Sequence, residues 1–165
     1  MKIIVFSDSH GKYNNMKKAL DMHPDAQFLL HLGDGTGDID CIDTSKISVY
    51  KVNGNYEDGI FSQAKEPSHQ CIEIGGKIIY MCHGHRHRVG FGLQNLLYSG
   101  LENNADIILY GHTHVKHNEY ASGQTKGVYL FNPGSITRPR DSMYASYGLI
   151  EMEKNGILLS HGIIK

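Results

Sequence analysis

The strongest constraint on the fold of this chain is a series of short apolar runs that repeatedly end in Asp, His, Asn or Gly. Each run has the length of a β-strand and is rich in Ile, Val, Leu, Tyr or Phe, which strands favour. We therefore expect much of the chain to form sheets. The runs cover residues 3–6, 28–32, 47–52, 70–74, 78–82, 107–110, 128–131, 147–152 and 157–160.

Two segments have a helical pattern instead. Residues 14–23 carry an apolar stripe that includes Met16 and Leu20 and ends before Pro24, and residues 91–102 carry Phe91 and several leucines at helical spacing. Alternation of strands and helices early in the chain, followed by strand pairs, predicts an α/β fold with mixed sheets.

Two glycine-containing pairs have the chemistry of two-residue hairpin turns: Gly75 with Gly76, and Asn155 with Gly156. They make part of the sheet antiparallel. The sequence contains no repeat, low-complexity tract or linker, so we interpret residues 1–165 as one domain.

Composition narrows the range of partners. Lys plus Arg is 16 and Asp plus Glu is 17, so we expect no nucleic-acid or membrane-surface binding. The apolar start at residues 3–6 is too short for a signal peptide or a membrane span. The three cysteines form no CxxC pair, which is typical of reduced thiols in the cytoplasm. We expect a cytoplasmic protein with a small-molecule substrate, and homo-oligomerisation stays open.

Ligand-type side chains follow six of the runs. In an open α/β sheet, ligands bind beyond the carboxyl ends of the strands, so these residues are expected to form one shared site. The candidates are Asp8, His10, Asp34, Asn55, His83, His85, His112 and His114, and Asn132 with Gly134 follows the sixth run.

The spacing of these residues suits metal binding. Asp8 and His10 are two residues apart, so in an extended segment both side chains would point the same way and could bind one ion. His112 and His114 repeat this spacing. Imidazole and carboxylate together suit Zn, Mn, Fe, Co or Ni better than Ca. Each piece alone is common in proteins without a metal, and only the ordered set indicates a site.

Other histidines are interpreted structurally. His23 is expected at a helix C-terminus, where a cation suits the helix dipole. His31, His69, His117 and His161 lack metal-site spacing and receive no role. The segment of His85, Arg86, His87 and Arg88 has two interpretations: it faces bound phosphate, or it is a solvated basic loop.

The ordered set resembles the calcineurin-like metallophosphoesterases. It consists of Asp8-x-His10, Gly33-Asp34, Gly54-Asn55, His83-Gly84-His85 and Gly111-His112-Thr113-His114, and the segment Asn132-Pro133-Gly134-Ser135 is similar to the compact YfcE-type phosphodiesterase branch.

The resemblance implies a four-layer α/β/β/α sandwich of two mixed β-sheets flanked by helices. It also implies a phosphodiesterase that uses two divalent ions per chain, with Mn²⁺ favoured over Fe, Ni, Co or Zn, and a metal-bridging hydroxide as nucleophile. Carried over residue by residue, Asp8, His10 and His114 hold the first ion, Asp34 bridges, and the second ion is held by Asn55, His83 and His112. Asn55 is also a candidate phosphate contact.

One departure leaves the general acid unidentified. Many members carry His after the Gly-Asn pair, whereas this chain has Tyr56 followed by Glu57, and the compact branch often lacks that His too. His85 is a candidate acid, and Asp38 could supply a later acidic position of the second motif. Two rival functions stay open: a retromer-subunit-like scaffold of the same fold, and a neighbouring enzyme such as a nuclease or a nucleotide or dinucleotide polyphosphate hydrolase.

Overall fold

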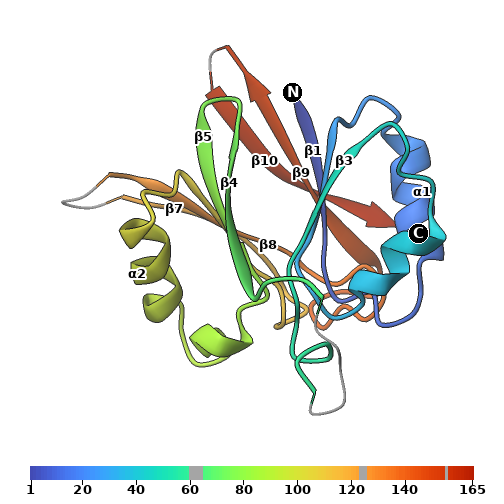
Figure 1. Ribbon diagram of the computed structural model, residues 1–165, viewed down its shortest axis with the longest axis horizontal. Helices are drawn as coiled ribbons and strands as arrows, with labels where there is room; N and C mark the ends of the chain where they lie inside the picture. Colours follow the sequence, from blue (N-terminus) through green and yellow to red (C-terminus); the bar gives the residue numbers. More distant parts are fainter. Residues whose placement is uncertain (60–64, 123–125, 155) are drawn as a thin grey trace.

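Two five-stranded sheets form the body of the protein (Figure 1). The computed structural model describes residues 1–59, 65–122, 126–154 and 156–165. The first sheet has the strand order β10-β9-β1-β2-β3 and the second the order β4-β5-β6-β8-β7. Both sheets are mixed, as the sequence predicts.

The first sheet combines three parallel strands with an antiparallel pair. Strand β1 pairs in parallel with β2, which pairs in parallel with β3, so the carboxyl ends of all three meet at one edge. The strands are β1 (Lys2–Phe6), β2 (Phe28–His31), β3 (Ser48–Lys51), β9 (Ala145–Glu153) and β10 (Gly156–Ile164).

The second sheet follows the same plan. Strands β5, β6 and β8 are parallel, whereas β4 and β7 pair antiparallel at the two edges. The strands are β4 (His69–Ile74), β5 (Lys77–Cys82), β6 (Ile107–Leu109), β7 (Lys116–Ala121) and β8 (Val128–Pro133). The carboxyl ends of its three parallel strands also lie at the same end of the sheet.

Three apolar clusters separate the layers. Ile3 and Val5 of the first sheet pack with Ile79 and Phe131 of the second in the cluster between the sheets. The outer face of the first sheet packs on helix α1 (Asn14–Met22) through Met16 and its neighbours. The outer face of the second packs on α2 (Gln94–Glu102) in a third cluster. The order helix, sheet, sheet, helix confirms the predicted four-layer sandwich.

The start of one helix and the presence of one strand differ from the sequence prediction. Helix α2 begins at Gln94 rather than at residue 91, because Gly92 has a φ of 143°, which no helix contains, and Phe91 is 96% exposed. Strand β7 was not predicted, because this edge strand has little buried surface and no apolar run. Two short 3-10 turns, η1 (Thr36–Cys41) and η2 (His85–His87), also lie in loops.

The first predicted hairpin is present and the second is partly described. Gly75 and Gly76 have φ of 60° and 71° and connect β4 to β5 antiparallel. Strands β9 and β10 pair antiparallel up to Glu153 and Gly156, and Asn155 lies outside the described residues.

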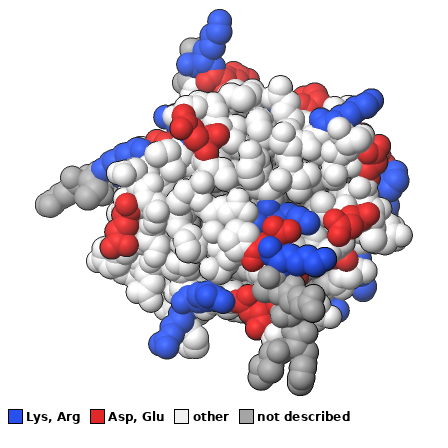
Figure 2. All heavy atoms as spheres, viewed as in Figure 1, with Lys and Arg blue, Asp and Glu red and all other residues white. Residues whose placement is uncertain are grey.

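The charged surface is mixed. Figure 2 shows Lys and Arg interspersed with Asp and Glu on this face, in keeping with the near balance of charges in the sequence. Among the described residues, no helix has the length and apolar character that crossing a membrane requires.

Candidate metal centre

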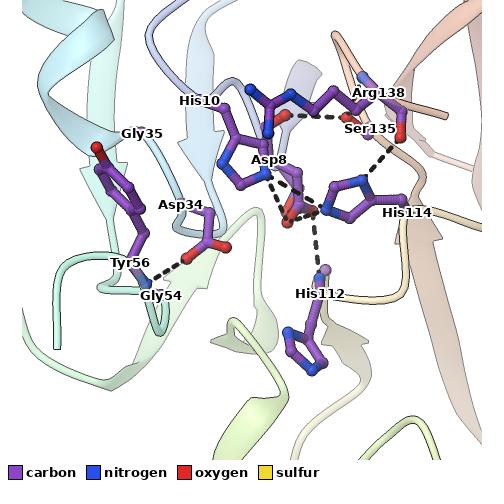
Figure 3. A network of polar contacts seen from close by, with 12 residues as sticks. Asp8, His10, Asp34, Gly35, Gly54, Tyr56, His112, His114, Ser135 and Arg138 are labelled. Atoms are coloured by element: carbon purple, nitrogen blue, oxygen red, sulfur yellow. Dashed lines mark hydrogen bonds and ion pairs between the residues drawn. The ribbon is translucent and has the colours of Figure 1, made fainter. Parts of the chain in front are cut away.

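Asp8, directly after β1, is the centre of a buried polar cluster (Figure 3). Its Oδ2 accepts hydrogen bonds from Ser7 Oγ at 2.6 Å and from the His112 backbone N–H at 3.2 Å. Its Oδ1 is buried and has no hydrogen-bond partner among the described residues. A buried carboxylate oxygen without a partner is costly, and a bound cation would remove that cost.

A first group of ligand-type atoms surrounds this oxygen. His114 Nε2 lies 3.1 Å and His10 Nε2 lies 4.0 Å from Asp8 Oδ1, and the two Nε2 atoms are 3.4 Å apart. These three side chains come close enough together to share one metal ion. Asp8 and His10 follow β1 of the first sheet, and His114 follows β6 of the second.

A second group shares Asp8 with the first. His83 Nε2, after β5, lies 3.8 Å from Asp8 Oδ1 and 3.5 Å from Oδ2 of Asp34, which follows β2. Asn55 Oδ1, after β3, lies 3.1 Å from the same nitrogen. The residue common to both groups is Asp8 in this structure, whereas the resemblance assigns the bridging role to Asp34.

His112 and His114 do not share a group, although the sequence interpretation gave them the same geometry. The ring of His114 joins Asp8 and His10, whereas that of His112 packs at 5.1 Å from the ring of His83. The structure thus places the rings of the two histidines in different surroundings.

The expectation of extended backbone at these motifs was wrong. Asp8, His10 and Asp34 have φ of 57°, 48° and 56°, and His112 and His114 have 68° and 59°. These values lie in the left-handed region, which non-glycine residues rarely adopt. Of the seven described non-glycine residues with positive φ, five therefore belong to this cluster. Such strain concentrates at functional sites and persists only when the surroundings enforce it.

Two histidine rings are oriented by backbone carbonyls. His83 Nδ1 donates to the Leu32 carbonyl and His114 Nδ1 donates to the Arg138 carbonyl, each at 2.7 Å. When each ring is neutral, these bonds leave its Nε2 atom facing the cluster as an electron-pair donor. Metal-bound histidines commonly have this support.

Electrostatics keep the carboxylates ionised. Burial opposes the ionisation of Asp34, but hydrogen bonding to and attraction by His83 outweigh it and lower the Asp34 pKa to about 2. The pKa of Asp8 is also lowered: burial raises it, and His114, His83 and Ser7 together overcome that effect. Burial lowers the pKa of His10, and Arg138 contributes in the same direction.

Glu57 supports the loop that carries Asp34, a role that the sequence interpretation missed. Its two carboxylate oxygens accept backbone N–H bonds from Asp34, Gly35, Thr36 and Gly54 at 2.6–3.2 Å. The Tyr56 N–H in turn donates to Asp34 Oδ1 at 2.8 Å. The acidic residue after the Gly-Asn pair was a signal in the sequence, but its partners required the fold.

The neighbouring loop is held in a similar way. Asp38 Oδ2 accepts from Ser9 Oγ at 2.6 Å and from the Gly11 N–H at 2.8 Å, so it fixes the backbone around His10. Fully buried His31 accepts the Gly33 N–H through Nδ1 at 3.2 Å. Both residues position the ligand loops without belonging to either ligand group.

The segment of His85 to Arg88 is partly exposed, with Arg86 and Arg88 at the surface. His85 Nε2 and the Arg86 guanidinium both bond Asp58 Oδ2, at 3.0 Å and 2.8 Å, so these two basic groups also have an acidic partner. His87 contacts Tyr80 and Cys82 instead. The ring of His85 lies 5.4 Å from that of His83, at the side of the second group.

His23 does cap α1, but not as a cation. Its ring contacts the Tyr147 hydroxyl at 2.9 Å, and burial lowers its pKa, so the neutral form predominates at pH 7. The expected favourable interaction of a charged His23 with the helix dipole is therefore absent.

The centre opens into a hollow of about 420 Å³. Its lining combines ligand-type residues with two arginines from the loop after β8: His10, Asp34, Asn55, His112, His114, Arg138 and Arg140. A small anionic molecule can therefore reach the cluster from solvent.

Sequence comparison shows the family. The profile of the calcineurin-like phosphoesterase superfamily domain matches residues 1–155. The chain belongs to this superfamily. Within it, the phosphodiesterase YfcE of Escherichia coli strain K12 is 27% identical over 172 aligned positions, which cover 92% of this chain and 88% of YfcE. The resemblance to the YfcE-type branch is confirmed.

Solved structures of relatives agree on the fold. A predicted phosphoesterase from Streptococcus pneumoniae has a TM-score of 0.79 and 29% identity, and the match covers 97% of this chain and 87% of that one. Vps29 of Entamoeba histolytica, crystallised with zinc, has a TM-score of 0.72 and 21% identity over 99% of each chain. At that identity the second likeness shows the fold alone.

Proposed function

We propose that this superfamily member is a phosphodiesterase that works with two divalent metal ions. The observation that carries the proposal is Asp8 Oδ1, a buried oxygen that has no hydrogen-bond partner in the described part of the chain and faces ring nitrogens of His114, His83 and His10 within 4.0 Å. Carboxylate and imidazole ligands suit Mn, Fe, Co, Ni and Zn, and manganese is our leading choice for activity.

The residues present fit two ions. Asp8, His10 and His114 would hold the first ion, and Asn55, His83 and His112 the second, with Asp34 as the bridging ligand. Ions in such a pair supply an activated water and neutralise charge on the phosphoryl oxygens. The chain contributes the ligand geometry, through strained loops that Glu57 and Asp38 hold in place.

Asn55 in the hollow, and Tyr56 and His85 near it, are the other groups to consider for the substrate. Asn55 lines the hollow and its side chain is exposed to it, which supports a role for the amide as a donor to a phosphoryl oxygen. Tyr56, 71% exposed, keeps its hydroxyl in solvent, and its backbone rather than its side chain bonds Asp34. His85 remains the candidate acid, oriented by Asp58.

The chief rival is a scaffold without activity, which the fold shared with Vps29 makes worth testing. A ligand set with all seven candidate positions filled, plus an open hollow above it, favours the enzyme. The name of YfcE as a phosphodiesterase supports the diester preference over polyphosphate hydrolysis.

Hydrolysis of bis(p-nitrophenyl) phosphate by the protein loaded separately with Mn²⁺, Co²⁺, Ni²⁺ or Zn²⁺ tests the proposal. We expect turnover with at least one of these ions, loss on chelation and recovery on re-addition. A panel with p-nitrophenyl phosphate and a dinucleoside polyphosphate separates the rival substrates. Protein that binds the ions and hydrolyses none of these compounds would support the scaffold instead.

A further inference from the structure

The hollow above the metal centre is asymmetric in charge. At its one end, Arg138 and Arg140 line it together with His10 and His114. Arg86 lines a neighbouring hollow at the side of the second group, and its guanidinium is neutralised there by Asp58, at 2.8 Å and 3.1 Å. Unpaired positive charge in the described part of this site therefore lies beside the first group.

The two arginines are fixed relative to the ligands. The Arg138 carbonyl accepts from His114 Nδ1, and the Arg138 N–H donates to Ser135 Oγ at 2.8 Å. The Arg140 N–H donates to the His114 carbonyl at 3.0 Å. Their backbone is thus hydrogen-bonded to the segment that carries His114, and Figure 3 shows the Arg138 side chain beside His10.

Neither guanidinium has an acidic partner within the described residues. The nearest acid in sequence, Asp141, bonds Lys116 instead, through its ammonium at 2.8 Å and its backbone N–H at 2.9 Å. Two arginines held at the mouth of a site, exposed and without carboxylates, are suited to bind an anion in bidentate fashion.

We propose that Arg138 and Arg140 recognise a second anionic group of the substrate, on the side of His10 and His114, next to the phosphodiester that is cleaved. This inference rests on the proposed phosphodiesterase function. The substrate class is therefore a phosphodiester with an additional carboxylate or phosphate on one arm, and the arm without that charge leaves toward His85.

Three p-nitrophenyl phosphodiesters test the proposal: the propyl ester and its carboxyethyl and phosphonoethyl counterparts. In each, water oxygen bonds to phosphorus, the bond to p-nitrophenolate breaks, and the released proton goes to solvent. All three share one leaving group, so only the charge on the retained arm differs. A charge-assisted contact predicts a kcat/KM for the anionic esters about tenfold or more above that of the propyl ester.

The readout is the ratio of anionic to propyl kcat/KM in manganese-loaded protein. In the double variant Arg138→Gln with Arg140→Gln we expect this ratio to fall close to one. A loss of activity that is equal for the anionic and propyl esters would leave the ratio unaffected. Lys46→Gln removes the same kind of charge beside α1, on a different hollow, and should keep the wild-type ratio. Preference for phosphonate over carboxylate, or the reverse, identifies the anion and supports the proposal in either case.

Two results would overturn it. One is a ratio near one in the wild type while the propyl ester is hydrolysed, which leaves the phosphodiesterase function intact. The other is a high ratio that the double variant retains. Hydrolysis of no ester with any ion would instead overturn the proposed function, and this inference with it.

Discussion

Asp8 and Asp34 have different surroundings, and these define the roles to be tested. Asp8 has one oxygen fixed by Ser7 and His112 and one to which no described residue gives a hydrogen bond. Asp34 has one oxygen fixed by the Tyr56 N–H and one at 3.5 Å from His83. Each carboxylate thus has one oxygen held by hydrogen bonds from N–H or O–H donors, and we propose that the other binds a cation.

Asp34→Asn tests the bridging assignment. Loss of an outer partner of a metal ligand typically costs about 10–100-fold, so loss of a ligand that contacts both ions should lower kcat by more than about 100-fold. The amide keeps the shape of the side chain, so the thermal midpoint should change little. Asp21→Asn, on the exposed face of α1, is the matched control. Near-normal turnover of Asp34→Asn at saturating metal would remove Asp34 from the bridge.

His31 gives a pH prediction that needs no metal. Complete burial lowers its pKa to about 4, against the opposing attraction of Glu57, Asp8 and Asp38. Because the unfolded value is about 6.5, His31 contributes full stability above pH 6.5 and loses it as the pH falls toward 4. The difference between the folded and unfolded pKa of His31 corresponds to a change in the free energy of unfolding on the order of 3 kcal/mol.

NMR titration of the His31 ring should show the neutral form persisting at pH 5. Chemical denaturation at pH 7 and pH 4.5 should show a smaller loss of stability in His31→Gln than in the wild type. A His31 ring that protonates near pH 6.5 in the folded protein would contradict the interpretation.

At the scale of elements, the site is made by loops that pack backbone against backbone. A Cβ at Gly54, after β3, would collide with the backbone nitrogen and side chain of Asp34. A Cβ at Gly33, after β2, would collide with Gly54 in turn. The β2 and β3 loops therefore approach each other at a distance that only glycine permits.

Gly54→Ala should displace Asp34 while the sheets stay intact. Since a shift of about 1 Å in a catalytic group can cost about 100-fold, we expect kcat/KM to fall by about 10–100-fold. Gly37→Ala, in η1, is the control, because an added Cβ there meets nothing within 4 Å. Equal activity of the two variants would show that the close approach is not needed.

Sequence patterns predict the interior strands well and the loop geometry poorly. Runs such as residues 3–6 and 107–110 are buried on both faces, so composition alone marks them as strands. The side chains of strand β7 are exposed or only partly buried, so its sequence has no apolar run to mark it as a strand. The divergence of His112 and His114 depends on left-handed backbone, which spacing does not reveal.

For the whole molecule, the arrangement of two sheets explains why residues from distant segments meet. The parallel strands of both sheets end at one side of the molecule. Backbone hydrogen bonds connect the loops there: the Asp8 N–H donates to the Gly33 carbonyl, and the Ile136 N–H donates to the Ser7 carbonyl. The candidate ligands could be predicted from strand ends. The contacts of Glu57 and His31 with the ligand loops, and the place of the two arginines beside the site, could not be predicted, because they arise only once the loops are packed.

Anomalous diffraction from crystals of the manganese-loaded protein tests the central claim most directly. We predict two manganese peaks per chain. One should lie within ligand distance of Asp8, His10 and His114, the other within ligand distance of Asn55, His83 and His112, and Asp34 should contact both. A single peak, or peaks away from these side chains, would contradict the two-metal account.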